Sequence, residues 1–170
     1  MPTLPRLLPA RRRRDPDQPR LSGLLAIIFW CACGITAVPL AGMFSLISVL
    51  GTQGAFSAIA DSLSGEAIAT QILRLGLVPQ ALLFIWGASF VVLTIMRSAS
   101  ARTLAPWLLL AWMLGTAAAQ FAIRNLLTPD GVTVGDFAAL LPGLLAQAAG
   151  VAAFWGYMKE AERPRRYFVR

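Results

Sequence analysis

Few polar residues of this chain could do chemistry, and three of them are glutamines inside otherwise apolar stretches: Gln80, Gln120 and Gln147. Arg124 follows Gln120 by four residues, about one turn of a helix. Polar groups in lipid are costly, so they are retained where they meet a partner or a solute. The four residues predict a polar pocket that opens to one side of a membrane. Hydrogen bonding between helices, worth roughly 0.6 kcal/mol per bond, is the simpler interpretation and the favoured one.

The residue types on which most enzymes depend are missing or badly spaced. The chain has no histidine, which removes the commonest general base and metal ligand. Cys31 and Cys33 point roughly 200° apart on a helix, so we interpret them as packing residues. The chain has no HExxH sequence and no Gly-Lys-Ser/Thr phosphate loop, and its apolar stretches hold no pair of carboxylates. We therefore expect no enzyme, no metal site and no cofactor.

The elements that must position these residues are four intervals without Asp, Glu, Lys or Arg: 21–60, 75–96, 103–123 and 137–158. Each can hold a helix of about 20 residues, the length that crosses a bilayer. Only 14% of the residues are charged and 57% are hydrophobic, which leaves too little polar surface for a soluble domain. The sequence predicts an all-α integral membrane protein, a four-transmembrane-helix bundle. Its spans are expected at about 22–50, 73–96, 104–126 and 137–158.

The first span and the connections carry weaker signals. The first span is longer than a bilayer core, so it must tilt or bend, and Pro39 is the expected position of a bend. Between residues 51 and 73, apolar residues recur at spacings of three to five, which fits an amphipathic helix on the membrane surface. The glycines of this segment fit a plain loop nearly as well. Thr133 and Asp136 are placed to cap the fourth span.

Basic residues are concentrated on one side of this arrangement. If all four spans cross, 13 of the 15 Arg and Lys residues share a side with both termini, and only Arg74 and Arg124 lie opposite. The positive-inside rule then predicts a protein of the bacterial inner membrane with both termini in the cytoplasm, and it excludes dual topology. The transmembrane domain, 21–158, is flanked by a disordered basic Pro-rich tail at 1–20 and a basic tail at 159–170.

Arginines in both tails are expected to contact anionic headgroups of the lipid bilayer, because basic residues next to a span are attracted to such a surface. These residues are Arg11, Arg12, Arg13, Arg14, Arg163, Arg165 and Arg166.

The end of the chain carries a short aromatic and basic pattern. Tyr157, Arg163 and Phe168 follow the spacing W-x-x-Y-x-x-x-S-x-R-x-x-x-x-F, with Phe154 and Ala161 at the tryptophan and serine positions. This pattern resembles the C-terminal signature of a domain-of-unknown-function family of small four-span bacterial inner-membrane proteins. The resemblance implies four spans with cytoplasmic ends, and it brings no activity with it.

The resemblance to that family also extends to the Ser-Gly-Leu-Leu sequence at 22–25. In physical terms the C-terminal pattern is typical of a helix that leaves the membrane, with Phe168 folded back into the lipid interface. A frayed polar tail is the alternative.

Two ridges of small residues would let helices approach one another closely. One comprises Ala111, Gly115 and Ala119 in the third span, and the other comprises Ala146 and Gly150 in the fourth. The leading hypothesis is a non-enzymatic structural, assembly or accessory factor. It would act through helix–helix contacts with another membrane protein or with a second copy. The alternative is a small transporter or permease component that uses the polar pocket.

Two further classes of function, a membrane enzyme and a nucleic-acid binding protein, have little support in the sequence. A membrane enzyme would have to work with only Asp, Ser or Arg residues of the outer connections, and alanine substitution of the acidic residues there would test it: Asp61, Glu66, Asp130 and Asp136. Nucleic acid is not an expected partner, because no predicted segment outside the membrane is long enough to form a reading domain.

Overall fold

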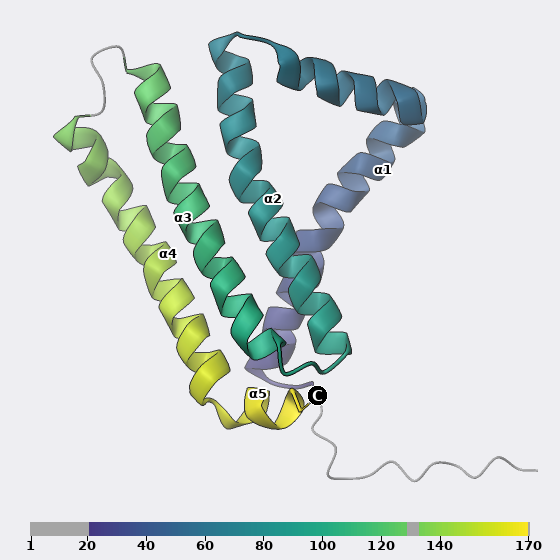
Figure 1. The fold of residues 1–170 in the computed structure, drawn as a ribbon, viewed down its shortest axis with the longest axis vertical. Coiled ribbons are helices and arrows are strands. Elements are labelled where there is room, and N and C mark those ends of the chain that lie inside the picture. The colour runs from purple at the N-terminus through teal and green to yellow at the C-terminus, as the bar shows by residue number, and fades with distance from the viewer. Residues whose placement is uncertain (1–20, 129–132, 170) are drawn as a thin grey trace, which may run out of the picture.

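The computed structural model describes residues 21–128 and 133–169 of the chain. Within these residues every regular element is a helix, and none is a strand (Figure 1). The helices are α1 (Leu24–Ser64), α2 (Ile68–Ile95), α3 (Ala101–Leu127), α4 (Val134–Glu160) and α5 (Glu162–Tyr167). The first four are long and apolar enough to cross a membrane. The predicted all-α fold with four long apolar helices is confirmed.

The first helix, α1, consists of two helical parts joined at a sharp bend. The bend lies at Gly51, whose φ of 72° and ψ of 170° are essentially restricted to glycine. The part before the bend ends where the first span was predicted to end. Residues 52–64 then run as a second helical part back towards the start of α2 (Figure 1). A helix therefore occupies most of the 51–73 connection, and the non-helical dihedral angles lie at Gly51, while Pro39 stays within the helix.

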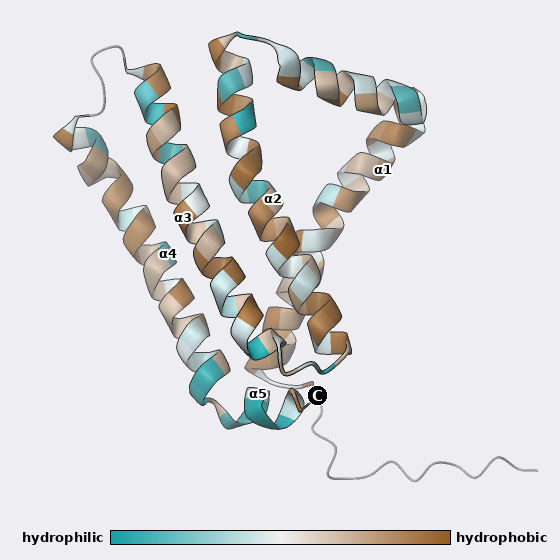
Figure 2. Ribbon diagram, in the orientation of Figure 1, coloured by the Kyte–Doolittle hydropathy of each residue, from teal (hydrophilic) through white to brown (hydrophobic). Residues whose placement is uncertain are grey.

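The four long helices converge at one end of the molecule and separate towards the other (Figure 1). We call the convergent end the packed end, and it is defined by one cluster of buried side chains: Leu25, Ala32, Trp86, Phe90, Ala101, Ala105, Met158, Tyr167 and Phe168. We call the opposite end the open end, and among the described residues it comprises 37–50, 52–74, 124–128 and 133–137. Figure 2 shows apolar residues along all four long helices and hydrophilic residues gathered on α5.

The open end buries little of its apolar surface. Every residue of α1 from Ala37 to Ser45 is exposed, and the side chain of Phe44 is 74% exposed. An apolar helix that is exposed on every side must be surrounded by lipid or by another protein.

The helices form a row in which α2 contacts both α1 and α3, and α3 contacts α4. Glycine allows the close approach of α1 to α2, because a Cβ atom on Gly87 would lie 3.3 Å from the carbonyl oxygen of Ala32. Gly115 of α3 makes room for the side chain of Leu82 of α2, because a Cβ atom on Gly115 would lie 2.6 Å from Cδ1 of Leu82. Small residues therefore lie at the contacts of α2 with α1 and with α3.

Candidate functional site

The three glutamines of the predicted polar pocket lie on three different helices, Gln80 on α2, Gln120 on α3 and Gln147 on α4. Gln80 is exposed, and the other two are half-buried. The Oε1 atom of Gln147 is enclosed and has no hydrogen-bond partner among the described residues. A pocket shared by the three side chains stays a prediction.

Arg124, the fourth residue of that predicted pocket, is held by an acidic residue of the next helix. Its Nη1 atom lies 2.7 Å from Oδ1 of Asp136, whose side chain is 17% exposed. The other carboxylate oxygen of Asp136 accepts hydrogen bonds from the backbone N–H and the hydroxyl of Thr133, at 3.0 and 2.8 Å. Thr133 in turn accepts from the backbone N–H of Asp136, so the predicted cap of α4 is present as a capping box. The guanidinium of Arg124 therefore ties α3 to the start of α4.

Arg74, the other basic residue of the open end, binds the end of the 52–64 helix. Its Nε donates to the carbonyl oxygen of Leu63, and its Nη2 donates to that of Gly65 at 2.9 Å. The last carbonyl groups of a helix lack partners within the helix, and a cation there also offsets the negative end of the helix dipole. Both basic residues of the open end therefore stabilise helix ends.

The short helix α5 folds back against the packed end. Tyr167 is 7% exposed and Phe168 is 2% exposed. The Tyr167 hydroxyl donates a hydrogen bond to the carbonyl oxygen of Thr94 at 3.2 Å, and the guanidinium carbon of Arg97 lies 5.1 Å from the centre of the tyrosine ring. Phe168 belongs to the protein core and not to the lipid interface, and the alternative of a frayed tail is wrong for these residues. The C-terminal segment completes the packed end.

The two sequence patterns that resemble the four-span family meet at the packed end. Gly23, of the first pattern, has a φ of 64°, and a Cβ atom there would overlap Nη1 of Arg163. Leu25, also of the first pattern, lies in the same buried cluster as Phe168. Tyr157 packs against this cluster. The matching residues therefore join the first described turn of the chain to its last.

Two of the arginines expected at lipid headgroups have contacts of their own within the protein. Arg165 donates from Nε to the carbonyl oxygen of Lys159 at 3.0 Å, and Arg166 forms an ion pair with Glu162. All three arginines of α5 are exposed, so headgroup contact stays a prediction for them. The calls for a disordered tail, for its lipid-binding arginines and for Asp130 lie outside the described residues: 1–20 and 129–132.

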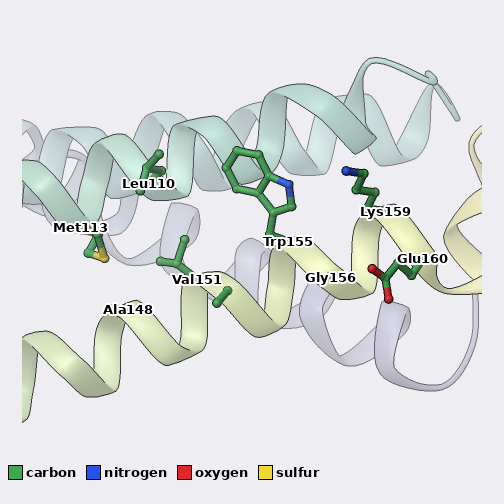
Figure 3. Close-up of a pocket in the computed structure, with 9 residues that line it drawn as sticks. Leu110, Met113, Ala148, Val151, Trp155, Gly156, Lys159 and Glu160 are labelled. Carbon is green, nitrogen blue, oxygen red and sulfur yellow. The ribbon is translucent and has the colours of Figure 1, made fainter.

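A groove of about 500 Å³ lies between α3 and α4 (Figure 3). Most of its wall is apolar, with Leu110 and Met113 from α3 and with Ala148, Val151 and Ala152 from α4, and Lys159 and Glu160 line its end near the packed end. We call this cavity the α3–α4 groove. None of the three glutamines lines it.

A second cavity of about 460 Å³ adjoins the α3–α4 groove at the packed end, and we call it the polar mouth of the groove. The two cavities share Trp155 and Lys159, and the mouth adds Arg102 and Trp107. The rings of Trp107 and Trp155 meet edge to face with their centres 4.9 Å apart. The Nε atom of Arg102 donates to the carbonyl oxygen of Met158 at 3.4 Å, which fixes Arg102 beside the end of α4.

Sequence reasoning missed this groove, although a signal for it exists. Arg102 and Lys159 mark the same end of two successive apolar intervals, and each has a tryptophan about one helical turn further in, Trp107 and Trp155. The pattern shows which residues share a depth. It does not show that the two helices are neighbours, which only the structure provides.

Comparison with protein-family models, with curated proteins and with solved structures found no match to this chain. The function must therefore follow from the sequence and from the geometry.

Proposed function

We propose that this chain is a non-enzymatic structural, assembly or accessory factor of the bacterial inner membrane that acts through helix–helix contacts. Its four long apolar helices make it a membrane protein. The orientation is inferred from charge. Arg102 at the start of α3, Lys159 at the end of α4 and the arginines of α5 lie at the packed end, whereas Arg74 and Arg124 bind helix ends at the open end. By the positive-inside rule this distribution supports a packed end, and both termini, in the cytoplasm.

The observation that carries the proposal is a difference between two ridges of small residues. The ridge on α3 is used within the molecule, because Leu82 packs onto Gly115 and Ala119 is only 6% exposed. The ridge on α4 is not used. Ala146 and Gly150 are exposed, and apart from the chain neighbours and backbone of its own helix no described atom lies within 4 Å of a Cβ atom built on Gly150. Such a ridge allows close approach of a helix in lipid, so it fits a helix of another membrane protein or of a second copy.

Photocrosslinking in the native membrane tests this proposal. A photoreactive amino acid at Ala146 is expected to form an adduct with a protein. The same amino acid at Ala118, an exposed alanine of α3, is expected to form adducts with lipid alone. Purification as a monomer without a partner, together with no protein adduct at Ala146, would contradict the proposal.

A pair of glycine variants separates a contact surface from a general effect on folding. Gly150→Leu is expected to abolish the adduct and the co-purification while the abundance of the protein stays unchanged, because the added side chain meets open space. Gly76→Leu is the matched control, since a Cβ atom on Gly76 also has no described atom within 4 Å. If both variants retain the partner, the α4 ridge is not the contact.

A small transporter or permease component is the second candidate, and Gln147 favours it. Its enclosed Oε1 atom without a partner is a polar atom that a solute or a water molecule would satisfy. Gln147→Leu is then expected to abolish the flux of small neutral and anionic solutes into proteoliposomes at unchanged abundance. Unchanged flux in a variant with all three glutamines replaced by leucine would exclude this function.

A further inference from the structure

The α3–α4 groove has the length of one leaflet of a bilayer. Arg102 at its mouth and Met113 at its far end are eleven residues apart on α3, and Lys159 and Ala148 are eleven apart on α4. At about 1.5 Å per residue each pair spans roughly 16 Å, close to half of a hydrocarbon core of about 30 Å. An acyl chain that starts at headgroup depth would fill the groove to the middle of the bilayer.

The charge of the mouth is positive. Arg102 lies in the first turn of α3, where the helix dipole also favours an anion, and Lys159 lies in the last turn of α4. Among the described residues neither side chain forms an ion pair. Glu160 lines the apolar part of the groove and not the mouth. Figure 3 shows Lys159 extending towards α3 and the Glu160 carboxylate directed away from it.

The tryptophans of the mouth suit the boundary between headgroups and acyl chains. Trp155 lines both the apolar part and the mouth, and its ring contacts that of Trp107, which is 55% exposed. Indole rings prefer this depth, because one edge is polar and the rest is apolar.

From these three features we propose that the α3–α4 groove binds one anionic glycerophospholipid. The phosphate group lies between Arg102 and Lys159, and an acyl chain runs along the wall formed by Leu110, Met113 and Val151. A zwitterionic lipid fits the wall equally well but gains less from the two cations. Each basic residue close to an anionic headgroup changes lipid affinity about fivefold. The site therefore selects phosphatidylglycerol over phosphatidylcholine.

Tryptophan fluorescence of the full chain in vesicles measures this selectivity. The vesicles are phosphatidylcholine with a small fraction of either brominated phosphatidylglycerol or brominated phosphatidylcholine, and bromine quenches indole fluorescence at short range. Brominated phosphatidylglycerol is expected to quench more at the same fraction. Trp155→Phe is expected to remove most of the extra quenching by brominated phosphatidylglycerol. That loss would show that the extra quenching arises in the groove.

Matched variants separate the site from the general charge of the surface. Lys159→Gln is expected to lower the preference for phosphatidylglycerol about fivefold. Arg166→Gln removes the same charge from an exposed side chain at the same end of the molecule but outside the groove, and it is expected to lower the preference clearly less than Lys159→Gln does. Ala152→Leu fills the groove and should lower quenching by both lipids. Ala149→Leu, an exposed position outside the groove, should not.

Two results would overturn the proposal. One is equal quenching by the two brominated lipids, or equal effects of Lys159→Gln and Arg166→Gln. The other is cover by a second copy of the chain, seen as quenching by both lipids that Trp155→Phe leaves unchanged, and as disulfide-linked dimers of Ala152→Cys that the parent chain does not form. The measurement uses this chain alone in vesicles, so it does not depend on the proposed helix–helix partner.

Discussion

The packed end and the open end of this molecule are held by different interactions. At the packed end, apolar side chains from all five described helices meet, and Phe90 and Phe168 are almost fully buried. At the open end, Arg74 binds backbone carbonyl groups and Arg124 binds Asp136, while α1 from 37 to 45 is exposed throughout. Lipid tails surround apolar side chains as well as protein does, so only the polar helix ends need partners there.

This difference gives the two ends different roles. A buried aromatic cluster fixes one geometry, because a core at close-packed density tolerates few arrangements. Helices that are joined only near their ends and otherwise face lipid keep their surfaces free for another helix. The α4 ridge of Ala146 and Gly150 is one of these free surfaces. The packed end therefore holds the helices in place, and this positions the exposed helix surfaces such as the α4 ridge.

The largest expected effect comes from the packed end. Phe168→Ala removes a ring that is 2% exposed, and emptying such a site costs about 3–5 kcal/mol. Thermal unfolding in mild detergent, followed by the helical circular dichroism signal, measures the loss. Phe44→Ala is the matched control at the open end, where the ring is 74% exposed, and we expect almost no change. Equal effects of the two variants would contradict the comparison of the two ends.

The contact between the first and last described turns gives the next effect. Gly23→Ala places a side chain at a φ of 64°, which costs about 1–3 kcal/mol, and the new Cβ atom also overlaps Arg163. The melting temperature should fall, and α5 should become accessible to protease. Gly34→Ala is the control, because Gly34 is helical with no described atom within 4 Å of its Cβ position. An intact α5 in the Gly23 variant would show that this contact does not hold it.

Much of the fold could be predicted from the sequence, because charge and hydropathy act locally along a chain. The four long helices and the cap of α4 follow from the uncharged intervals and from the types of Thr133 and Asp136. The burial of Tyr167 and Phe168 could not be predicted, because two aromatic residues among arginines are equally typical of a tail on lipid. Their burial depends on a space left by α1, α2 and α4 together. Of the candidate pocket, the described residues show one side-chain contact, the ion pair of Arg124 with Asp136.

The bend at Gly51 tests whether the open end has a fixed shape. Gly51→Ala is expected to cost about 1–3 kcal/mol, because its φ of 72° and ψ of 170° suit glycine alone. Gly42→Ala is expected to stabilise by about 0.5–1 kcal/mol, because Gly42 is helical and its Cβ position meets no described atom within 4 Å. Thermal unfolding of both variants shows whether each substitution raises or lowers the stability of the protein. A neutral Gly51→Ala would mean that α1 straightens without loss and that the bend is not part of a fixed fold.

The cap of α4 gives the smallest effect and separates local from global stability. Thr133→Ala removes the hydroxyl that accepts from the first turn of α4, which costs about 1 kcal/mol at a helix start. Hydrogen exchange at that turn should become about fivefold faster, whereas the melting temperature should barely change, because the packed end carries the cooperative core. Ser48→Ala is the control, since its hydroxyl bonds only to its own helix. If the melting temperature falls as far as it does in Phe168→Ala, the two ends unfold as one unit, and the open end contributes to the core stability that we assign to the packed end alone.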